Sequence, residues 1–328
     1  VFTVLRMADM LQTYGFASKI VIYDDPAFDI SPQWERISQY FPNLRKEDFF
    51  AFSGDWDALP GADIAVATFW PSAYHLLRMR DVTKKVLLVQ DFEPAFYPAG
   101  TEYALAENAL RMPFSRLFNT PGLLAYVERI YPVPGKSAYF TPACDERYAF
   151  CEKELRPPYR VLFYARPDAP RNAFSLCVAF AKALKRKYRE GVELVCAGGS
   201  LSEGEKALFE GCCDFAGVVP YENLPDFYAS FHFVVSFMLT KHPSYLPFEA
   251  MACGCVPIVN DNEANLWLLK DGENCLMAQA AVTPLMKAFE RGLDPELYRE
   301  IAAEGCRTVR ATNWEGEMAK IAAFFRNL

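Results

Sequence analysis

The chain has 328 residues, a length that favours two domains over a single core. Apolar residues make up 52% of the sequence and charged residues 23%, proportions that are typical of a folded globular protein. The formal net charge of −7 argues against nonspecific nucleic-acid binding, because phosphate backbones select strongly basic surfaces. A small phosphorylated ligand needs only a local positive site, so the acidic total does not exclude one.

The ten cysteines follow neither a disulfide nor a zinc pattern. No Cys-x-x-Cys pair occurs, and Cys212-Cys213 and Cys253-x-Cys255 lack histidines at ligand spacing. We therefore expect no metal site and a reducing, cytoplasmic location. With no secretory leader and no run of about 18 apolar residues, we expect no transmembrane segment, while contact with the inner face of a membrane stays open.

In the first half, residues 1–14 predict an amphipathic helix and residues 19–23 a strand. Because parallel α/β domains usually open with a strand, we expect a further strand and a glycine-rich loop upstream of residue 1. The other expected elements are strands over 62–68, 85–89 and 138–141, helices over 71–79 and 101–110, and an extended loop over 92–98.

The pattern breaks at a charged run and Pro157-Pro158, so we divide the chain into residues 1–155, 156–310 and a C-terminal helix within 311–328. The second part alternates regularly, with strands over 159–165, 192–197, 214–218, 232–237 and 256–260 and helices over 172–189, 202–211, 222–230, 246–253 and 265–269. Nearly continuous apolar strands, each followed by a helix, predict a parallel sheet covered on both faces. The fold class is therefore α/β, with two Rossmann-like domains facing a cleft and ligands at the carboxyl ends of the strands.

The segment 242–259 carries the strongest functional signal. It predicts a loop, a short helix from Leu246, a stop at Gly254 and a buried strand. Pro247 suits the first helical position, and the free amides at the helix start favour a phosphate. Glu249 in the first turn either accepts hydrogen bonds from a sugar diol or only satisfies the helix dipole.

The residues before this helix have two interpretations each. His242, Ser244 and Tyr245 could contact the ligand, but Ser244 could instead cap the helix and Tyr245 could simply pack. Gly198 follows a strand and either admits a ligand or makes a turn, and Val219, after the next strand, could border a base-binding pocket.

Arg166 and Arg171 lie in the loop after the first strand of the second domain. Guanidinium groups bind phosphate bidentately, so the pair could converge on one anion, although both could also be solvated loop charges. In the first domain, Asp91 and Glu93 leave a strand together. They could act as a general base or bind acceptor hydroxyls, or they could only cap the turn.

The segment Pro247-Phe-Glu-Ala-Met-Ala-Cys-Gly-Cys-Val-Pro-Ile-Val259 closely resembles the donor site of retaining, family-4-type glycosyltransferases with the GT-B fold. The resemblance implies that Glu249 binds the nucleotide ribose, that the helix amides hold the diphosphate, and that Arg166 and Arg171 grip the phosphates. The stretch from Gly217 to Tyr228 is similar as well. The final helix fits a tail that crosses back to the first domain.

One position departs from that family. A second glutamate usually stands eight residues before the one that matches Glu249, and here the position is Lys241. Lys241 therefore joins the donor-binding candidates without an inherited role. The glycines usual in the intervening loop are also replaced, by Lys-His-Pro-Ser-Tyr.

The stretches Phe163-Tyr-Ala-Arg-Pro167 and Gln90-Asp-Phe-Glu-Pro94, with the His-Pro-Ser-Tyr loop, are similar to a narrower branch. Its members are bacterial rhamnosyltransferases that build S-layer and O-antigen glycans from dTDP-rhamnose. The resemblance implies transfer from a nucleoside-diphosphate sugar to a saccharide acceptor, which could be lipid-linked, without a cofactor or metal. A nucleotide-sugar epimerase or hydrolase of the same fold, and a catalytically inactive binding module, remain the alternatives.

Overall fold

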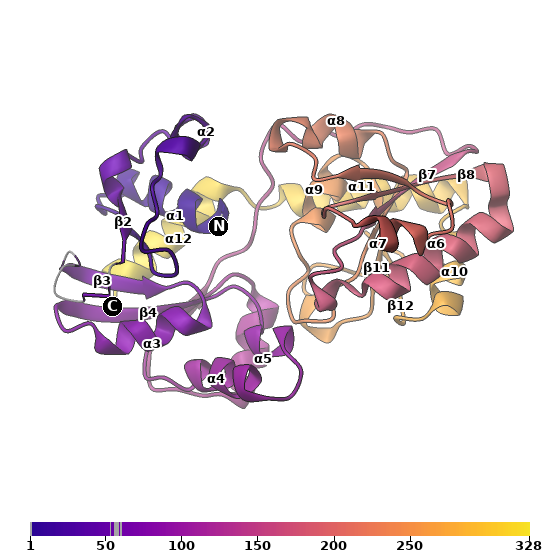
Figure 1. Cartoon of the computed structure of the whole chain (residues 1–328). Helices are drawn as coiled ribbons and strands as arrows, with labels where there is room; N and C mark the ends of the chain where they lie inside the picture. Colours follow the sequence, from indigo (N-terminus) through magenta and orange to yellow (C-terminus); the bar gives the residue numbers. More distant parts are fainter. Residues whose placement is uncertain (1, 53, 56–58, 60) are drawn as a thin grey trace. The chain divides into compact units, whose positions relative to one another are not determined.

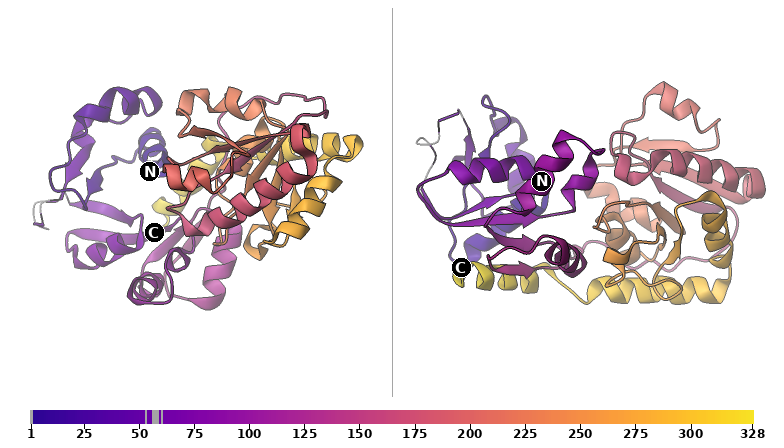
Figure 2. Two further views of the ribbon diagram at one scale, coloured as in Figure 1. Left: turned by 45° about the vertical axis from the view of Figure 1, so that its right-hand side comes forward. Right: turned by 90° about the horizontal axis from the view of Figure 1, so that it is seen from below.

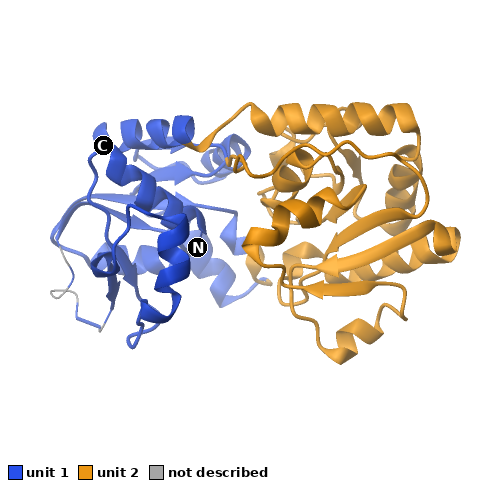
Figure 3. Cartoon of the chain, turned by 90° about the horizontal axis from the view of Figure 1, so that it is seen from above, with its two compact units in different colours: residues 1–94, 99–141, 315–328 blue, residues 95–98, 142–314 orange. Residues whose placement is uncertain are grey.

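The computed structural model describes residues 2–52, 54, 55, 59 and 61–328 of the chain. Their contacts divide it into two compact units (Figure 3). Unit 1 comprises residues 1–94, 99–141 and 315–328, and unit 2 comprises residues 95–98 and 142–314. The divisions thus fall after residues 141 and 314, whereas the sequence placed them after residues 155 and 310.

Unit 1 is built around two parallel sheets (Figure 1). Strands β1 (Ile20–Ile22) and β2 (Phe49–Ala51) form a pair, and β3 (Ala62–Ala67), β4 (Val82–Val89), β5 (Ser115–Phe118) and β6 (Ser137–Tyr139) form a four-stranded sheet in that order. The helices are α1 (Phe2–Thr13), α2 (Trp34–Tyr40), α3 (Trp70–Arg78), α4 (Thr101–Leu110) and α5 (Pro121–Ile130). Val1, the first residue of the helix expected over 1–14, lies outside the described residues.

The C-terminal helix α12 (Trp314–Arg326) runs into unit 1 and lies near α1 there (Figure 2). Arg326 donates a hydrogen bond to the carbonyl of Tyr14 at 2.7 Å. The backbone amide of Thr141 donates to the buried Glu317 carboxylate at 2.8 Å, which ties the helix to the end of the stretch 99–141 of unit 1.

Unit 2 contains a six-stranded parallel sheet in the order β12-β11-β10-β7-β8-β9. Its strands are β7 (Tyr159–Tyr164), β8 (Val192–Ala197), β9 (Asp214–Gly217), β10 (Phe233–Ser236), β11 (Val256–Asn260) and β12 (Leu276–Ala278). Its helices are α6 (Phe174–Tyr188), α7 (Glu203–Ala207), α8 (Leu224–Ala229), α9 (Leu246–Ala252), α10 (Val282–Arg291) and α11 (Pro295–Arg310).

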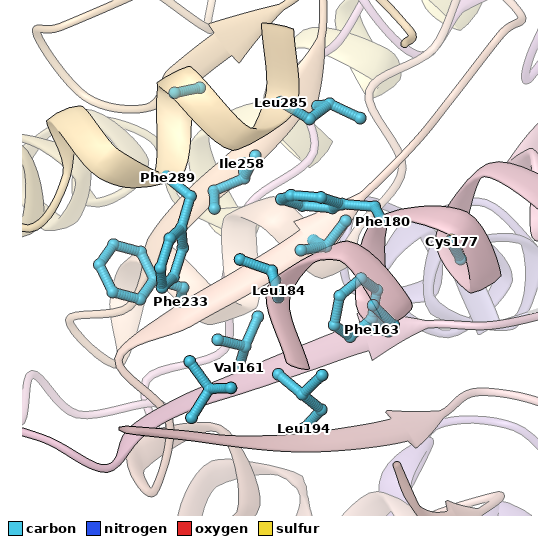
Figure 4. Packing of buried hydrophobic residues seen from close by; sticks show 14 of the residues in the cluster. Val161, Phe163, Cys177, Phe180, Leu184, Leu194, Phe233, Ile258, Leu285 and Phe289 are labelled. Carbon is cyan, nitrogen blue, oxygen red and sulfur yellow. The ribbon is translucent and has the colours of Figure 1, made fainter. Parts of the chain in front are cut away.

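Alternate residues of the central strand β10 enter different apolar clusters on the two faces of this sheet. Phe233 and Val235 pack with Phe180 of α6 and Phe289 of α10 in one cluster (Figure 4), while Val234 belongs to the other. Every residue of β10 is buried. The continuous apolar strands of the sequence are therefore explained by a sheet that is covered on both sides.

Two expected elements are wrong. The helix expected over 265–269 is a 3-10 turn, Glu263–Asn265, because the Asn262 side chain accepts the amide of Ala264 and fixes a local turn. The loop expected over 92–98 is not extended throughout, since Glu93–Phe96 forms another 3-10 turn.

Candidate functional site

Helix α9 begins and ends as the sequence predicts. Pro247 lies in its first turn, where a missing N–H leaves no bond unmade. Gly254 follows the helix with φ +75°, and the amide of Cys255 returns to the carbonyl of Ala250 at 2.9 Å. A Cβ at position 254 would lie 2.6 Å from the carbonyl oxygen of Cys151, so only glycine fits there.

Glu249, in the first turn of α9, is held by two tyrosine hydroxyls. Burial raises the pKa of its carboxyl to about 7, although hydrogen bonds from Tyr228 and Tyr148 act in the opposite direction. Both tyrosines are buried, and their ring centroids lie 6.1 Å apart. The carboxyl therefore lies beside two hydroxyls, and its raised pKa keeps part of it protonated at neutral pH.

The segment 145–148, near the passage of the chain into unit 2, supports this carboxyl. Arg147 Nη2 donates to the Tyr148 hydroxyl at 3.2 Å, and its guanidinium lies 3.4 Å from the centroid of the Tyr221 ring. The Tyr221 hydroxyl in turn donates to Asp145. Sequence reasoning missed Tyr148 because its segment has no motif, and Tyr228 because the similar stretch 217–228 assigned it no role.

Arg166 and Arg171 leave the end of β7 on one loop, both half-buried. Arg166 Nη1 donates to the Tyr164 hydroxyl at 3.2 Å, and the Arg171 guanidinium lies 4.3 Å from the centroid of the Phe96 ring, which belongs to unit 2. Neither arginine forms an ion pair with a carboxylate of the described residues. Two cations without a carboxylate partner suit an anionic ligand.

Three asparagines, which the sequence analysis did not identify, fix the loop that follows β10. The Asn172 amide donates to the carbonyl of Phe237 at 3.1 Å, and Asn260 both accepts from and donates to the backbone of Met238. Asn262 donates to the carbonyl of Met238 at 3.2 Å. These contacts bring the carboxyl ends of β10 and β11 and the Arg171 loop together.

The Arg171 loop is also hydrogen-bonded directly to the β10 loop, residues 237–245, which follows β10. The carbonyl of Arg171 accepts the amide of Leu239 at 2.9 Å. Further along the β10 loop, Lys241 Nζ lies 3.8 Å from Glu263 Oε1, so this departure from the family pattern places an ion pair beside the loop.

The residues expected around the start of α9 have different surroundings. His242 is buried, and its Nδ1 accepts the amide of Ser244 at 3.0 Å. Tyr245 packs between the rings of His242 and Phe248, and Leu246 is buried at the first position of the helix. The cap interpretation of Ser244 is wrong, because Tyr245 occupies the N-cap position and no side chain caps it.

Gly198 and Val219 follow neighbouring strands. Gly198 has φ +102°, and a Cβ there would lie 2.4 Å from the Tyr164 ring, so this glycine makes a turn that admits that ring. Val219 packs partly against the apolar cluster that contains Tyr148 and Tyr228. It therefore lies at the edge of the Glu249 surroundings.

Asp91 and Glu93 are both buried in unit 1. Glu93 accepts the amide of Trp70, the first residue of α3, at 2.7 Å, and burial raises the pKa of its carboxyl to about 8 with a further contribution from the Asp91 charge. A carboxyl that is mostly protonated at neutral pH is a poor general base. Asp91 accepts the amide of Phe92 at 2.7 Å and is the better base candidate of the two.

In the described part of the chain, no group of three or more His, Cys, Asp or Glu side chains is arranged to hold a metal ion. Nor is any helix in that part long and apolar enough to cross a bilayer. All ten cysteines lie among the described residues and are free thiols.

Two family models match the chain: the N-terminal domain of WsaF over residues 5–120 and the C-terminal domain of WsaF over residues 159–290. The O-antigen biosynthesis protein RfbC of Myxococcus xanthus is 34% identical over 98% of the chain. The chain spans only 25% of the length of that relative.

Solved structures share the fold over the whole chain. Sucrose-phosphate synthase from Thermosynechococcus elongatus has a TM-score of 0.76 at 16% identity, covering 99% of this chain and 92% of that one. HepE from Anabaena, in complex with UDP and glucose, has a TM-score of 0.73 at 14% identity, covering 99% and 95%. These likenesses confirm the GT-B fold that the sequence predicts.

Proposed function

Because the chain belongs to the WsaF family, with its two domain models matched in order, we propose that it is a glycosyltransferase of bacterial surface-glycan synthesis. It moves a sugar from a nucleoside-diphosphate sugar to a hydroxyl of a saccharide acceptor. The relationship to an O-antigen biosynthesis protein supports the surface-glycan assignment.

The observation that carries the proposal is the pair of arginines, Arg166 and Arg171, whose loop is bonded to the β10 loop that leads into the helix of Glu249. In our proposal the two guanidinium groups bind the diphosphate and stabilise the charge that develops on it as the glycosidic bond breaks. In the same proposal, Glu249 accepts a hydrogen bond from a hydroxyl of the nucleotide ribose. The arginines supply the positive charge that a metal ion provides in other phosphate sites, so we propose a metal-independent reaction that needs no cofactor.

The finer assignments rest on resemblance. We propose a retaining outcome from the likeness of residues 247–259 to retaining enzymes, and dTDP-rhamnose as donor from the narrower rhamnosyltransferase branch. UDP sugars belong in any test, since HepE was solved with UDP and glucose. Asp91 is the proposed contact or base for the acceptor hydroxyl.

For location we propose the cytoplasmic side of a membrane, with an acceptor that could be lipid-linked. The ten free thiols support a reducing compartment. The basic residues of α6 add no support for membrane contact, because Lys182, Lys185 and Lys187 each pair with a glutamate. That cluster fits a solvated helix face better.

The deciding experiment is a thermal-shift screen with dTDP, UDP and GDP, followed by incubation with the matching nucleotide sugars and a saccharide acceptor. We expect one nucleotide to raise Tm selectively and mass spectrometry to detect a glycosylated acceptor. Consumption of the donor without acceptor would favour an epimerase or hydrolase. Binding without any turnover would identify an inactive binding module, and no binding at all would refute the donor site.

A further inference from the structure

The β10 loop, residues 237–245, contains a backbone conformation that its sequence does not favour. Ser244 has φ +68°, in the left-handed region that glycine adopts readily and that costs free energy for a residue with a Cβ. It stands where the related family has a glycine-rich loop. A strained residue of this kind persists only when the surrounding structure holds it.

His242 is the residue that holds this turn. Its Nδ1 accepts the backbone amide of Ser244, two residues on, at 3.0 Å. The same connection from residue i to residue i+2 is made by an asparagine or aspartate oxygen in an Asx turn. His242 therefore performs with a ring nitrogen what a shorter acceptor performs in ordinary turns.

The second ring nitrogen of His242, Nε2, indicates that the bond at Nδ1 is the reason why the ring is buried here. Because Nδ1 accepts, the hydrogen lies on Nε2, and Nε2 is buried without a hydrogen-bond partner among the described residues. The residue is only 5% exposed, and burial lowers the pKa of the imidazole to about 3, so the ring stays neutral and Nδ1 stays available. An unpaired buried donor is costly, so its retention points to the bond at Nδ1.

The rest of the loop is anchored elsewhere. The carbonyl of Met238 is held by Asn260 and Asn262, and the amide of Leu239 by the carbonyl of Arg171. Helix α9 follows immediately after Tyr245. The Ser244 turn thus determines the direction of the backbone between Leu239, which is bonded to Arg171, and the helix that carries Glu249.

We propose that His242 is a positioning residue of the donor site, which holds the Ser244 turn and thereby fixes Glu249 relative to the Arg171 loop. It acts through the backbone and does not contact the nucleotide. The nucleotide part of this inference rests on the proposed function, whereas the support of the turn does not.

The experiment compares four variants with the unchanged protein: His242→Leu, which removes the acceptor; His242→Asn, which keeps one; Ser244→Gly, which removes the strain; and the double variant His242→Leu with Ser244→Gly. Hydrogen exchange of the peptide covering residues 237–246 reports on the loop. Calorimetric titration with dTDP and, separately, with UDP reports on the donor site.

We expect His242→Leu to accelerate exchange in the loop and to weaken nucleotide affinity about tenfold. His242→Asn should retain both properties within about twofold, and Ser244→Gly should restore most of what His242→Leu loses. The matched control is His232→Leu, because His232 Nδ1 also accepts a backbone amide, that of Arg160 at 3.0 Å, but at the amino end of β10. It should change neither the loop exchange nor the affinity.

Unchanged loop exchange in His242→Leu would overturn the inference, as would a double variant no better than the single one. If neither dTDP nor UDP binds the unchanged protein, the proposed function fails, and the exchange measurements still decide whether His242 holds the turn.

Discussion

Replacing Glu249 with glutamine should stabilise the protein at alkaline pH while it weakens nucleotide binding. The pKa of the Glu249 carboxyl is raised from 4.5 in the unfolded chain to about 7 by burial. A difference of this size corresponds to at most about 3 kcal/mol between the two protonation states. The folded protein is therefore destabilised by ionised Glu249 above neutral pH, although its tyrosine partners reduce the penalty.

The sign follows from proton binding. Since the folded pKa lies above the unfolded one, the stabilising contribution of the protonated carboxyl is complete below pH 4.5 and is lost as the pH rises to about 7. Glutamine does not titrate. The unfolding free energy of the variant should exceed that of the unchanged protein by less than about 1 kcal/mol at pH 5 and by up to about 3 kcal/mol at pH 8.

The assay is urea denaturation followed by fluorescence at pH 5, 6, 7 and 8, with nucleotide affinity measured on the same samples. Glu190→Gln is the control, because the Glu190 side chain is 96% exposed and should give no pH-dependent difference. Glu249→Gln and the unchanged protein could instead differ in unfolding free energy by the same amount at pH 5 and pH 8. That result would refute the argument that ionisation of Glu249 destabilises the folded protein.

Three further substitutions test the proposed site and the backbone turn that follows helix α9. Arg171→Ala should weaken nucleotide affinity about tenfold to a hundredfold, because charge-assisted bonds to phosphate are lost, while Arg156→Ala, an exposed arginine, should not; equal calorimetric affinities would contradict the assignment. Gly254→Ala should cost more than about 1 kcal/mol through the contact of its Cβ with a carbonyl, whereas Gly204→Ala, with open space around its Cβ, should be neutral or stabilising in thermal unfolding. Asp91→Asn should lower kcat about a hundredfold with nucleotide affinity unchanged, and normal turnover would remove Asp91 from the reaction.

The sequence predicted the sheet of unit 2 better than that of unit 1 for a physical reason. In unit 2 the strands are apolar on both faces, so the pattern is continuous and easy to recognise. Strand β5 of unit 1 was missed because it contains Arg116, which is normally a surface residue. Here Arg116 is buried, and it pairs with Glu128 at 2.5 Å and with the carbonyl of Tyr131 at 2.7 Å. Partners that lie 12 and 15 residues further along the chain cannot be predicted from the local sequence pattern.

The same limit applies to the site. Arg166, Arg171 and Glu249 are recognisable because strand ends and helix starts are local features of the sequence. Tyr148 and the asparagine Asn172 reach the site only through tertiary contacts, with Glu249 and with the carbonyl of Phe237. For Ser244 the sequence left a ligand contact and a helix cap open, because serine suits the cap by propensity. The cap is wrong because the helix begins one residue later, with Tyr245 at the N-cap position.

Three features with a free-energy cost lie in the stretch that the sequence singled out, and others lie elsewhere in unit 2, such as the positive φ of Ala173 and Glu210. Ser244 has a left-handed backbone, His242 carries an unpaired buried donor, and the pKa of the half-buried Glu249 carboxyl is raised. Each of these would be removed by a glycine, a smaller acceptor or a glutamine without disturbing the apolar faces of the sheet. Strain and unfavourable burial that a single substitution could relieve are typical of residues that serve a ligand. The three features at residues 242–249 therefore agree with the donor site that the resemblance implies.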